Sequence, residues 1–498
     1  MYNRTILRAA RAALLTAALA IVLCSCSLII NEYDETPRER TTALAHTDGT
    51  FPELTAPPVP GGIAVGDVTA EIPDLEAVAE PLPDRDYSDR ALTVAVVSET
   101  VCTMMPDESS PFYAACALRN DAVIKKYGTV PQFIFYTRQE VSEGIKKTQA
   151  SGGTALDDFY ADVVEMPARS SGVLALSGLL VNLHSLPFYT APEGGSASAG
   201  SLIGRLWFEI SETVDDPGAL LVLLCRRDAT SDGGDALYGA ALSGNFTFDL
   251  FLETAVGTMT ADDGLKAVSV SSSTDAGILG EAAVLRSGLR YTGDITNGRE
   301  LTWAKGELKE TVSSLIGRLS SVTCTGAPPE PEGVSPYELF QSGRAAFYVC
   351  TLEELDSTVY AGKTDYLLLP LPYSSDAPAG IAVRKNVLCV PVINRRSEMT
   401  GILLNAYRAF SGDWIRESYL PEFASEKMRD SNSLFTLKLI LRERSAVDFA
   451  EIMCDSIRDL GNLTVSAAWG GMRSDAPLSE LTDKAVTALN KLLAQNRK

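Results

Sequence analysis

The run Ala91-Leu92-Thr93-Val94-Ala95-Val96-Val97 decides how the chain folds, because it is apolar almost without interruption. A strand that is buried on both faces has this pattern, and such strands occur chiefly in parallel sheets covered by helices. Ser109 or Ser110 is placed to cap the helix that should follow. That helix should end at Tyr127, because Gly128 can adopt the left-handed conformation that closes a helix. The spacing predicts the strand–helix unit of an α/β fold.

The same alternation continues along the chain. Further strands are expected at 132–136, 161–166, 219–225, 345–349 and 365–371, and helices at 140–149, 171–183, 247–256, 308–319, 335–343, 399–410, 434–442, 447–460 and 478–493. Strands that alternate with helices predict an α/β protein with mainly parallel sheets. With 46% apolar residues over 498 positions, the chain can fill more than one core, so we expect two lobes.

The N-terminus has the three parts of an export signal. Three arginines provide a basic start, and an apolar run over residues 12–23 follows, too short to span a bilayer as a helix of about 20 residues. The run ends in Leu23-Cys24-Ser25-Cys26, which resembles the lipobox of bacterial lipoproteins. We expect residues 1–25 to be removed and Cys26 to carry lipid, anchoring the chain to the outer face of the cytoplasmic membrane. An ordinary secretory signal with incidental cysteines is the alternative.

Residues 26–87 are expected to form a disordered tether between the lipid and the folded body. This segment is rich in proline and acidic residues and has too little apolar surface to offset the entropy of ordering. The whole chain is acidic, with 64 acidic against 43 basic residues and a net charge of −21. Such a surface repels phosphate groups, so nucleic acid is excluded as a partner.

The cysteines give no evidence of a metal site. Of the nine, Cys24 leaves with the signal and Cys26 takes lipid, so seven remain and they cannot all pair within the chain. No Cys-x-x-Cys spacing occurs, and we expect neither a metal nor another cofactor.

Several motifs occur in the same order as in one known family. Tyr160-Ala161-Asp162-Val163-Val164 and Ser177-Gly178-Leu179-Leu180-Val181-Asn182-Leu183 match a strand that begins with Asp and a helix that ends in Gly-Leu-Leu. Further matches are Arg119-Asn120 with Ile124-Lys125-Lys126-Tyr127-Gly128, Gly244-Asn245-Phe246-Thr247-Phe248-Asp249-Leu250-Phe251-Leu252, Phe340-Gln341-Ser342-Gly343-Arg344-Ala345-Ala346-Phe347 and Leu369-Pro370-Leu371-Pro372. Together they resemble the extracellular solute-binding proteins of ABC importers, of the carbohydrate-type family 1 close to maltose-binding protein.

The resemblance implies a type II periplasmic-binding-protein-like fold. Lobe one would comprise residues 88–212 plus 362–415, and lobe two residues 213–361 plus 416–498. A small solute, expected to be a carbohydrate or oligosaccharide, would be captured between the lobes by hinge closure and delivered to an ABC permease. The resemblance also implies a monomer without covalent chemistry.

Five residues are candidates for contact with the solute. Glu165 lies near the carboxyl end of one expected strand and Arg169 follows it, while Glu353 follows another strand; Trp207 lies near the expected hinge, and Trp469 lies in a Gly-rich loop. The alternative is that the charged residues are solvated and the tryptophans are packing residues. Because aromatic residues are scarce where relatives stack sugar rings, a degenerate cleft in a sensor or scaffold lipoprotein is the second hypothesis.

An enzyme is the weakest alternative. The chain has only two histidines, His46 in the tether and His184, and no Gly-x-Ser-x-Gly motif accompanies them. A surface glycan hydrolase with two carboxylates stays open as a third hypothesis, although no pair of acidic residues indicates one.

Overall fold

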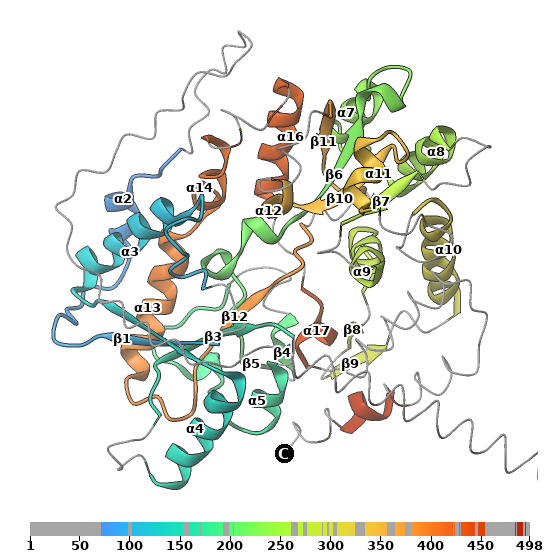
Figure 1. Cartoon of the computed structure of the whole chain (residues 1–498). Coiled ribbons are helices and arrows are strands. Elements are labelled where there is room, and N and C mark those ends of the chain that lie inside the picture. Colours follow the sequence, from blue (N-terminus) through green and yellow to red (C-terminus); the bar gives the residue numbers. More distant parts are fainter. Residues whose placement is uncertain are drawn as a thin grey trace, which may run out of the picture. The chain divides into compact units, whose positions relative to one another are not determined.

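The folded part of the chain contains two four-stranded sheets, each packed against helices (Figure 1). The computed structural model describes residues 71–97, 102–152, 159–169, 171–192, 199–202, 204–259, 267–271, 276–290, 292–295, 298–301, 306–323, 334–355, 364–373, 380–421, 423, 428, 430–443, 447–453, 484, 486–491 and 494. All of these residues belong to one unit that begins at Thr42, and the other unit, residues 1–41, lies outside them.

The first sheet has the strand order β12-β3-β1-β2. Its strands are β12 (Asn386–Cys389), β3 (Val163–Pro167), β1 (Leu92–Val97) and β2 (Pro131–Tyr136). Every residue of β1 is buried, and β1 runs parallel to both of its neighbours, as its apolar run predicts. β12 pairs antiparallel with β3. We call this sheet and the helices packed on it the first lobe.

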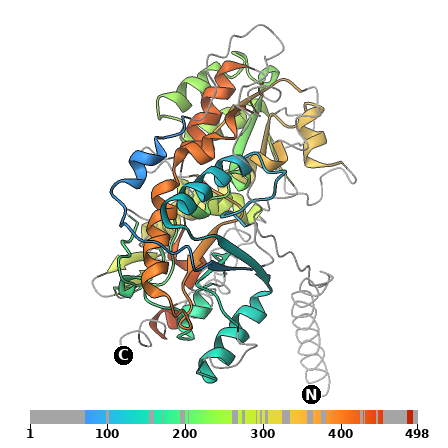
Figure 2. The ribbon, with the colours of Figure 1, turned by 90° about the vertical axis from the view of Figure 1, so that its left-hand side faces the viewer.

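Helices lie on both faces of the first sheet. They are α2 (Leu75–Ala79), α3 (Tyr113–Tyr127), α4 (Arg138–Ala150), α5 (Gly172–Leu176) and α13 (Ser397–Phe410). Figure 1 shows α3 and α13 on one side of the sheet and α4 and α5 on the other. α2 packs on both α3 and α13, which Figure 2 shows from the side.

Two expected helix ends in this lobe are wrong. α3 begins after Phe112 without a side-chain cap, because Ser109 instead donates to the Asp107 carboxylate in the preceding turn. Its other end is confirmed, since Gly128 has a φ of 69°. The helix expected at 171–183 stops at Leu176, because Gly178 turns the chain with a φ of 69°.

The second sheet has the strand order β11-β6-β10-β7. Its strands are β11 (Tyr366–Leu369), β6 (Leu221–Arg226), β10 (Phe347–Thr351) and β7 (Val268–Val270). β10 is parallel to β7, but β6 is antiparallel to both β10 and β11. The expectation of a mainly parallel sheet is therefore wrong here, because β6 arrives directly from the other lobe rather than through a crossover helix. Since β11 pairs with β6, residues 366–369 lie in the second lobe and not, as expected, in lobe one.

Further strands and α-helices are described beside those of the two sheets and the helices above. They are β4 (Ser201–Leu202), β5 (Arg205–Leu206), α7 (Asp235–Leu242), α8 (Phe248–Thr258), α9 (Ala276–Arg286), β8 (Thr292–Ile295), β9 (Gly298–Leu301), α10 (Gly306–Val322), α11 (Pro336–Gln341), α12 (Leu352–Glu354), α14 (Asp413–Glu417), α16 (Ser431–Arg442) and α17 (Phe449–Met453). α17 covers the start of the helix expected at 447–460, and most of the helix expected at 478–493 lies outside the described residues. None of the described helices is long and apolar enough to cross a membrane.

Alternate residues of β6 belong to different apolar clusters. Leu221, Leu223 and Cys225 share a cluster with residues of α8, α9 and α10, whereas Val222 and Leu224 share one with residues of α14 and α16. This period of two places helices on both faces of the second sheet, as in the first.

Two of the described segments that pass between the lobes run antiparallel to each other. Glu209 pairs with Leu388, and Leu220 pairs with Ala382. The N–H of Leu221 donates to the carbonyl of Ile381 at 2.7 Å. One segment leads into β6 and the other into β12, so the antiparallel strand of each sheet is the strand that has just crossed.

Candidate functional site

Glu165, in the middle of β3, is completely buried. The N–H and the hydroxyl of Thr103 both donate to its Oε1 at 2.7 Å, the Cys102 thiol donates to Oε2 at 3.3 Å, and the Asn386 amide donates to Oε1 at 3.2 Å. Burial raises the pKa of this carboxyl, and the hydrogen bonds oppose that rise. In this conformation Glu165 holds the loop after β1 against the start of β12 and offers no exposed atom to a solute.

The loop after β1 is also held from the side of α3. The carbonyl of Met104 accepts hydrogen bonds from the buried Arg119 guanidinium at 2.6 Å and from the Asn120 amide at 3.1 Å. A pocket of about 30 Å³ lies between Met105, Pro106 and α3. The Arg119-Asn120 motif of the sequence therefore fixes a loop at the carboxyl end of a strand, where α/β folds place their ligands.

Arg169 follows β3 and belongs to a group of four charged side chains. Its guanidinium lies 3.4 Å from the carboxylate of Glu281 on α9. The amine of Lys385, just before β12, lies 4.0 Å from the same carboxylate and 2.9 Å from the carboxylate of Glu451 on α17. Arg169 is the exposed member, with 42% of its side chain accessible, whereas the other three side chains are at most 8% accessible.

Glu353, on α12 directly after β10, is 59% exposed. Its carboxylate lies 2.5 Å from the guanidinium of Arg384, which is also 3.2 Å from the buried carboxylate of Asp216. Asp216 and Arg384 stand on the two segments that cross between the lobes. Burial raises the pKa of the Asp216 carboxyl, and Arg384 opposes that rise. The structure thus places Glu353, one of the five candidate residues, beside the segments that pass between the lobes.

The remaining candidates are not exposed or not described. Trp207 is 4% exposed and lies in the large apolar cluster. Trp469 and the proposed lipidation residue Cys26 lie outside the described residues. Within the described ranges, no group of three or more His, Cys, Asp or Glu side chains could hold a metal ion.

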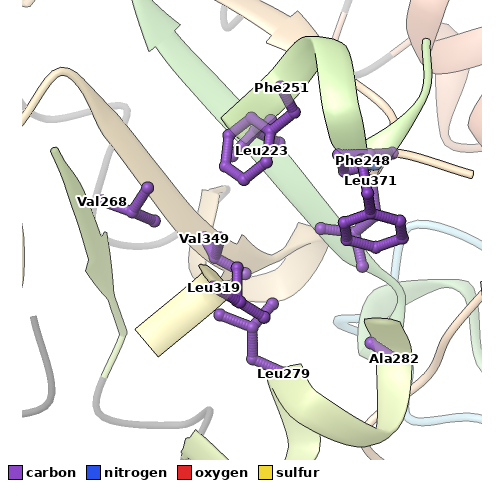
Figure 3. A pocket seen from close by; sticks show the side chains of 10 residues that line it. Leu223, Phe248, Phe251, Val268, Leu279, Ala282, Leu319, Val349 and Leu371 are labelled. Carbon is purple, nitrogen blue, oxygen red and sulfur yellow. The ribbon is translucent and has the colours of Figure 1, made fainter. Parts of the chain in front are cut away.

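A small apolar cavity in the second lobe is a packing feature rather than a binding site. It has a volume of about 10 Å³, roughly one water molecule. Figure 3 shows it between Leu223 of β6, Phe248 and Phe251 of α8, and Leu279 of α9. It is too small for a sugar, and the side chains around it carry no hydrogen-bonding groups.

Glu281, Lys385 and Glu451 were not predicted from the sequence. A usable signal is present in α9, because Glu281 is the single acidic residue among the apolar residues of Ala276–Arg286. A charge within an apolar helix must either reach water or find a partner, since burying it alone is costly. The partners Lys385 and Glu451 come from distant parts of the chain, and their proximity is decided only by the fold.

Two sheets of this order, joined by antiparallel crossing segments, define the two-lobed type II class of periplasmic-binding-protein-like folds. No protein-family model matches the sequence, and a comparison with curated protein sequences gives no match. Fold similarity to solved structures is nevertheless extensive.

One similar structure is the galacto-N-biose-/lacto-N-biose I-binding protein of an ABC transporter from Bifidobacterium longum. It is 10% identical, with a TM-score of 0.51, and the match covers 82% of this chain and 98% of that chain. The sugar-binding protein MalE of Xanthomonas citri is 11% identical with a TM-score of 0.49, covering 82% and 98%. The GacH receptor of Streptomyces glaucescens is 14% identical with a TM-score of 0.45, covering 81% and 99%. The first of these confirms the two-lobed fold that the motifs predicted.

Proposed function

We propose that the chain is the solute-binding component of an ABC importer and captures a small carbohydrate or oligosaccharide between its lobes. The observation that carries the proposal is the pair of antiparallel crossing segments, which join two α/β lobes as a hinge requires. The fold shared with the Bifidobacterium protein, whose name states a sugar ligand, supports it. An ABC permease would be the partner of a monomeric binding protein, and no covalent step is assigned.

The exposed charged side chains near the crossing would supply the polar contacts. Arg169, Glu353 and Arg384 are each 42–59% exposed, so they can exchange a protein partner for a solute hydroxyl. Glu165 would act behind them as a positioning residue, since it fixes the loop after β1. Trp207 would pack rather than stack on a sugar ring, and Trp469 stays a candidate for stacking.

Thermal unfolding with a panel of mono- and oligosaccharides tests the proposal. A solute at 100 times its dissociation constant adds about 2.7 kcal/mol to the free energy of unfolding. Arg384→Gln should reduce the shift caused by the binding solute, whereas Arg318→Gln should leave it unchanged. Arg318 is a matched control, because it is 47% exposed and pairs with Asp249 within the second lobe. If no carbohydrate raises the melting temperature, carbohydrate import is excluded.

One observation favours the second hypothesis, a sensor or scaffold with a degenerate cleft. Both tryptophans in the described residues, Trp207 and Trp414, are buried, so neither offers a face to a sugar ring. A chain of this kind would bind no solute in the panel and would still be found at the membrane. Hydrolysis of a glycan by the purified chain would instead support the enzyme hypothesis.

The lipid anchor is proposed on the lipobox alone and needs a separate experiment. Cys26→Ala should abolish incorporation of labelled palmitate and release the chain from the membrane fraction. Cys24→Ala is the matched control, because it removes a neighbouring thiol that leaves with the signal. Retention of label in Cys26→Ala would exclude this cysteine as the lipidated residue.

A further inference from the structure

The charge cluster of Arg169, Glu281, Lys385 and Glu451 joins elements of both lobes. Arg169 and Lys385 flank strands of the first sheet, since one follows β3 and the other precedes β12. Glu281 stands on α9, whose Leu279 and Ala282 line a small cavity together with residues of the second sheet. The two ion pairs of Glu281, at 3.4 and 4.0 Å, therefore run from one lobe to the other.

α17 brings the fourth charge to the same place. It contacts α5, and the approach is so close that a Cβ on Gly172 would lie 2.3 Å from the carbonyl oxygen of Ile452. This contact sets Glu451 beside Lys385, at 2.9 Å. Lys385 thus keeps a carboxylate partner of its own, whether or not Glu281 is near.

The four side chains differ in what would happen to them if the lobes separated. Arg169 is already 42% exposed, and Lys385 would stay paired with Glu451. Glu281, which is buried in this conformation, would gain water. Each charge would therefore have water or a partner in the separated state, so no isolated buried charge opposes the opening.

We propose that Glu281, bound by Arg169 and Lys385, is a reversible electrostatic latch that holds the two lobes together before a solute binds. The latch goes beyond the proposed function, because it acts on the chain without a ligand. The latch sets the fraction of molecules whose lobes are open to a solute. The smaller that fraction is, the lower the apparent affinity for the solute.

Single-molecule fluorescence energy transfer on the ligand-free chain tests the latch. Dyes attached through non-canonical amino acids at Lys146 of α4 and Val256 of α8 report the distance between the lobes, since both positions are exposed. Glu281→Gln should raise the population with low transfer efficiency about tenfold over the unsubstituted chain. Asp249→Asn removes an exposed carboxylate of the second lobe that pairs within that lobe, and it should leave the distribution unchanged.

A Glu281→Gln chain that is folded by circular dichroism and has the unsubstituted distribution would overturn the latch. If Glu281→Gln does not fold, Arg169→Gln replaces it, because its exposed side chain tolerates change. Arg169→Gln should shift the population in the same direction, and an unchanged distribution would again overturn the proposal. The double variant should match Glu281→Gln alone if Arg169 acts through Glu281, whereas additive shifts would exclude this pair. These measurements contain no solute, so they are independent of the sugar panel.

Discussion

β12 and β6 occupy corresponding places in the two lobes, but the residues directly before the two strands differ in character. Each strand arrives from the other lobe, and each runs antiparallel to its neighbours. β12 is entered through Arg384 and Lys385, both ion-paired with buried acids. β6 is entered through Pro217–Ala219 and Leu220, all buried and uncharged.

The difference shows how two halves of similar topology can carry different functions. Apolar packing holds the four residues directly before β6, whereas the acid that precedes them, Asp216, pairs with Arg384 on the other approach. Ion pairs hold the approach to β12, and those with an exposed member can exchange partners with a polar solute. We therefore expect substitutions that remove a charge to lower the free energy of unfolding more at the approach to β12 than at β6. The loss should be larger where the group that loses its partner is buried.

The largest effect is expected at the approach to β12. Lys385→Met leaves the buried carboxylates of Glu281 and Glu451 without their shared cation, which should cost about 3–5 kcal/mol of the free energy of unfolding. Leu221→Met at the start of β6 is the control, because it conserves volume and should cost less than about 1.5 kcal/mol. Urea denaturation measures both. Equal losses would contradict the difference between the approaches.

Glu165→Gln should cost about 1–3 kcal/mol, because an amide group would face the hydrogen-bond donors that now bind a carboxylate. The released loop should also expose Cys102, whose thiol would react faster with an alkylating reagent than in the unsubstituted chain. Glu76→Gln is the control, because that side chain is 81% exposed. An unchanged alkylation rate would show that the loop does not depend on Glu165.

A pH effect is expected at Tyr160 in the first lobe. Its hydroxyl donates to Asp162 at 2.5 Å, and burial raises the pKa of Tyr160 from 10.0 to about 12. The folded chain keeps this proton where the unfolded chain loses it, so stability should fall as pH rises from 10 to about 12. Denaturation at several pH values should show a shallower fall for Tyr160→Phe. If the free energy of unfolding falls equally with pH in the unsubstituted chain and in Tyr160→Phe, Tyr160 does not contribute to this pH dependence.

The smallest effect is expected at Glu353. Its ion pair with Arg384 is solvent-exposed, and such pairs contribute about 0.2–1 kcal/mol. Glu353→Gln should therefore barely change the urea midpoint. Asp216→Asn, which alters the buried partner of the same arginine, should cost more. A larger loss for Glu353→Gln would mean that exposure does not rank these two pairs.

Much of the fold was predictable because local patterns agree with it. The apolar run at 91–97, Gly128 after α3 and the collinear motifs predicted a strand, a helix end and a two-lobed architecture, all of which the structure contains. A missed signal is the capping box of Thr137 and Glu140, which starts α4 at Arg138 rather than at residue 140. Helix ends depend on a few atoms, and for this reason they were predicted less well than the elements themselves.

The sequence by itself determined the acidic character of the chain and the strand–helix order, since each is written in neighbouring residues, and it predicts an export signal with a lipobox. Only the tertiary structure decided the direction of β6, the lobe to which β11 belongs, and the partners of Glu281. These depend on contacts between residues more than a hundred positions apart. No local pattern records such a contact, because the energy that favours it appears only when the chain has folded.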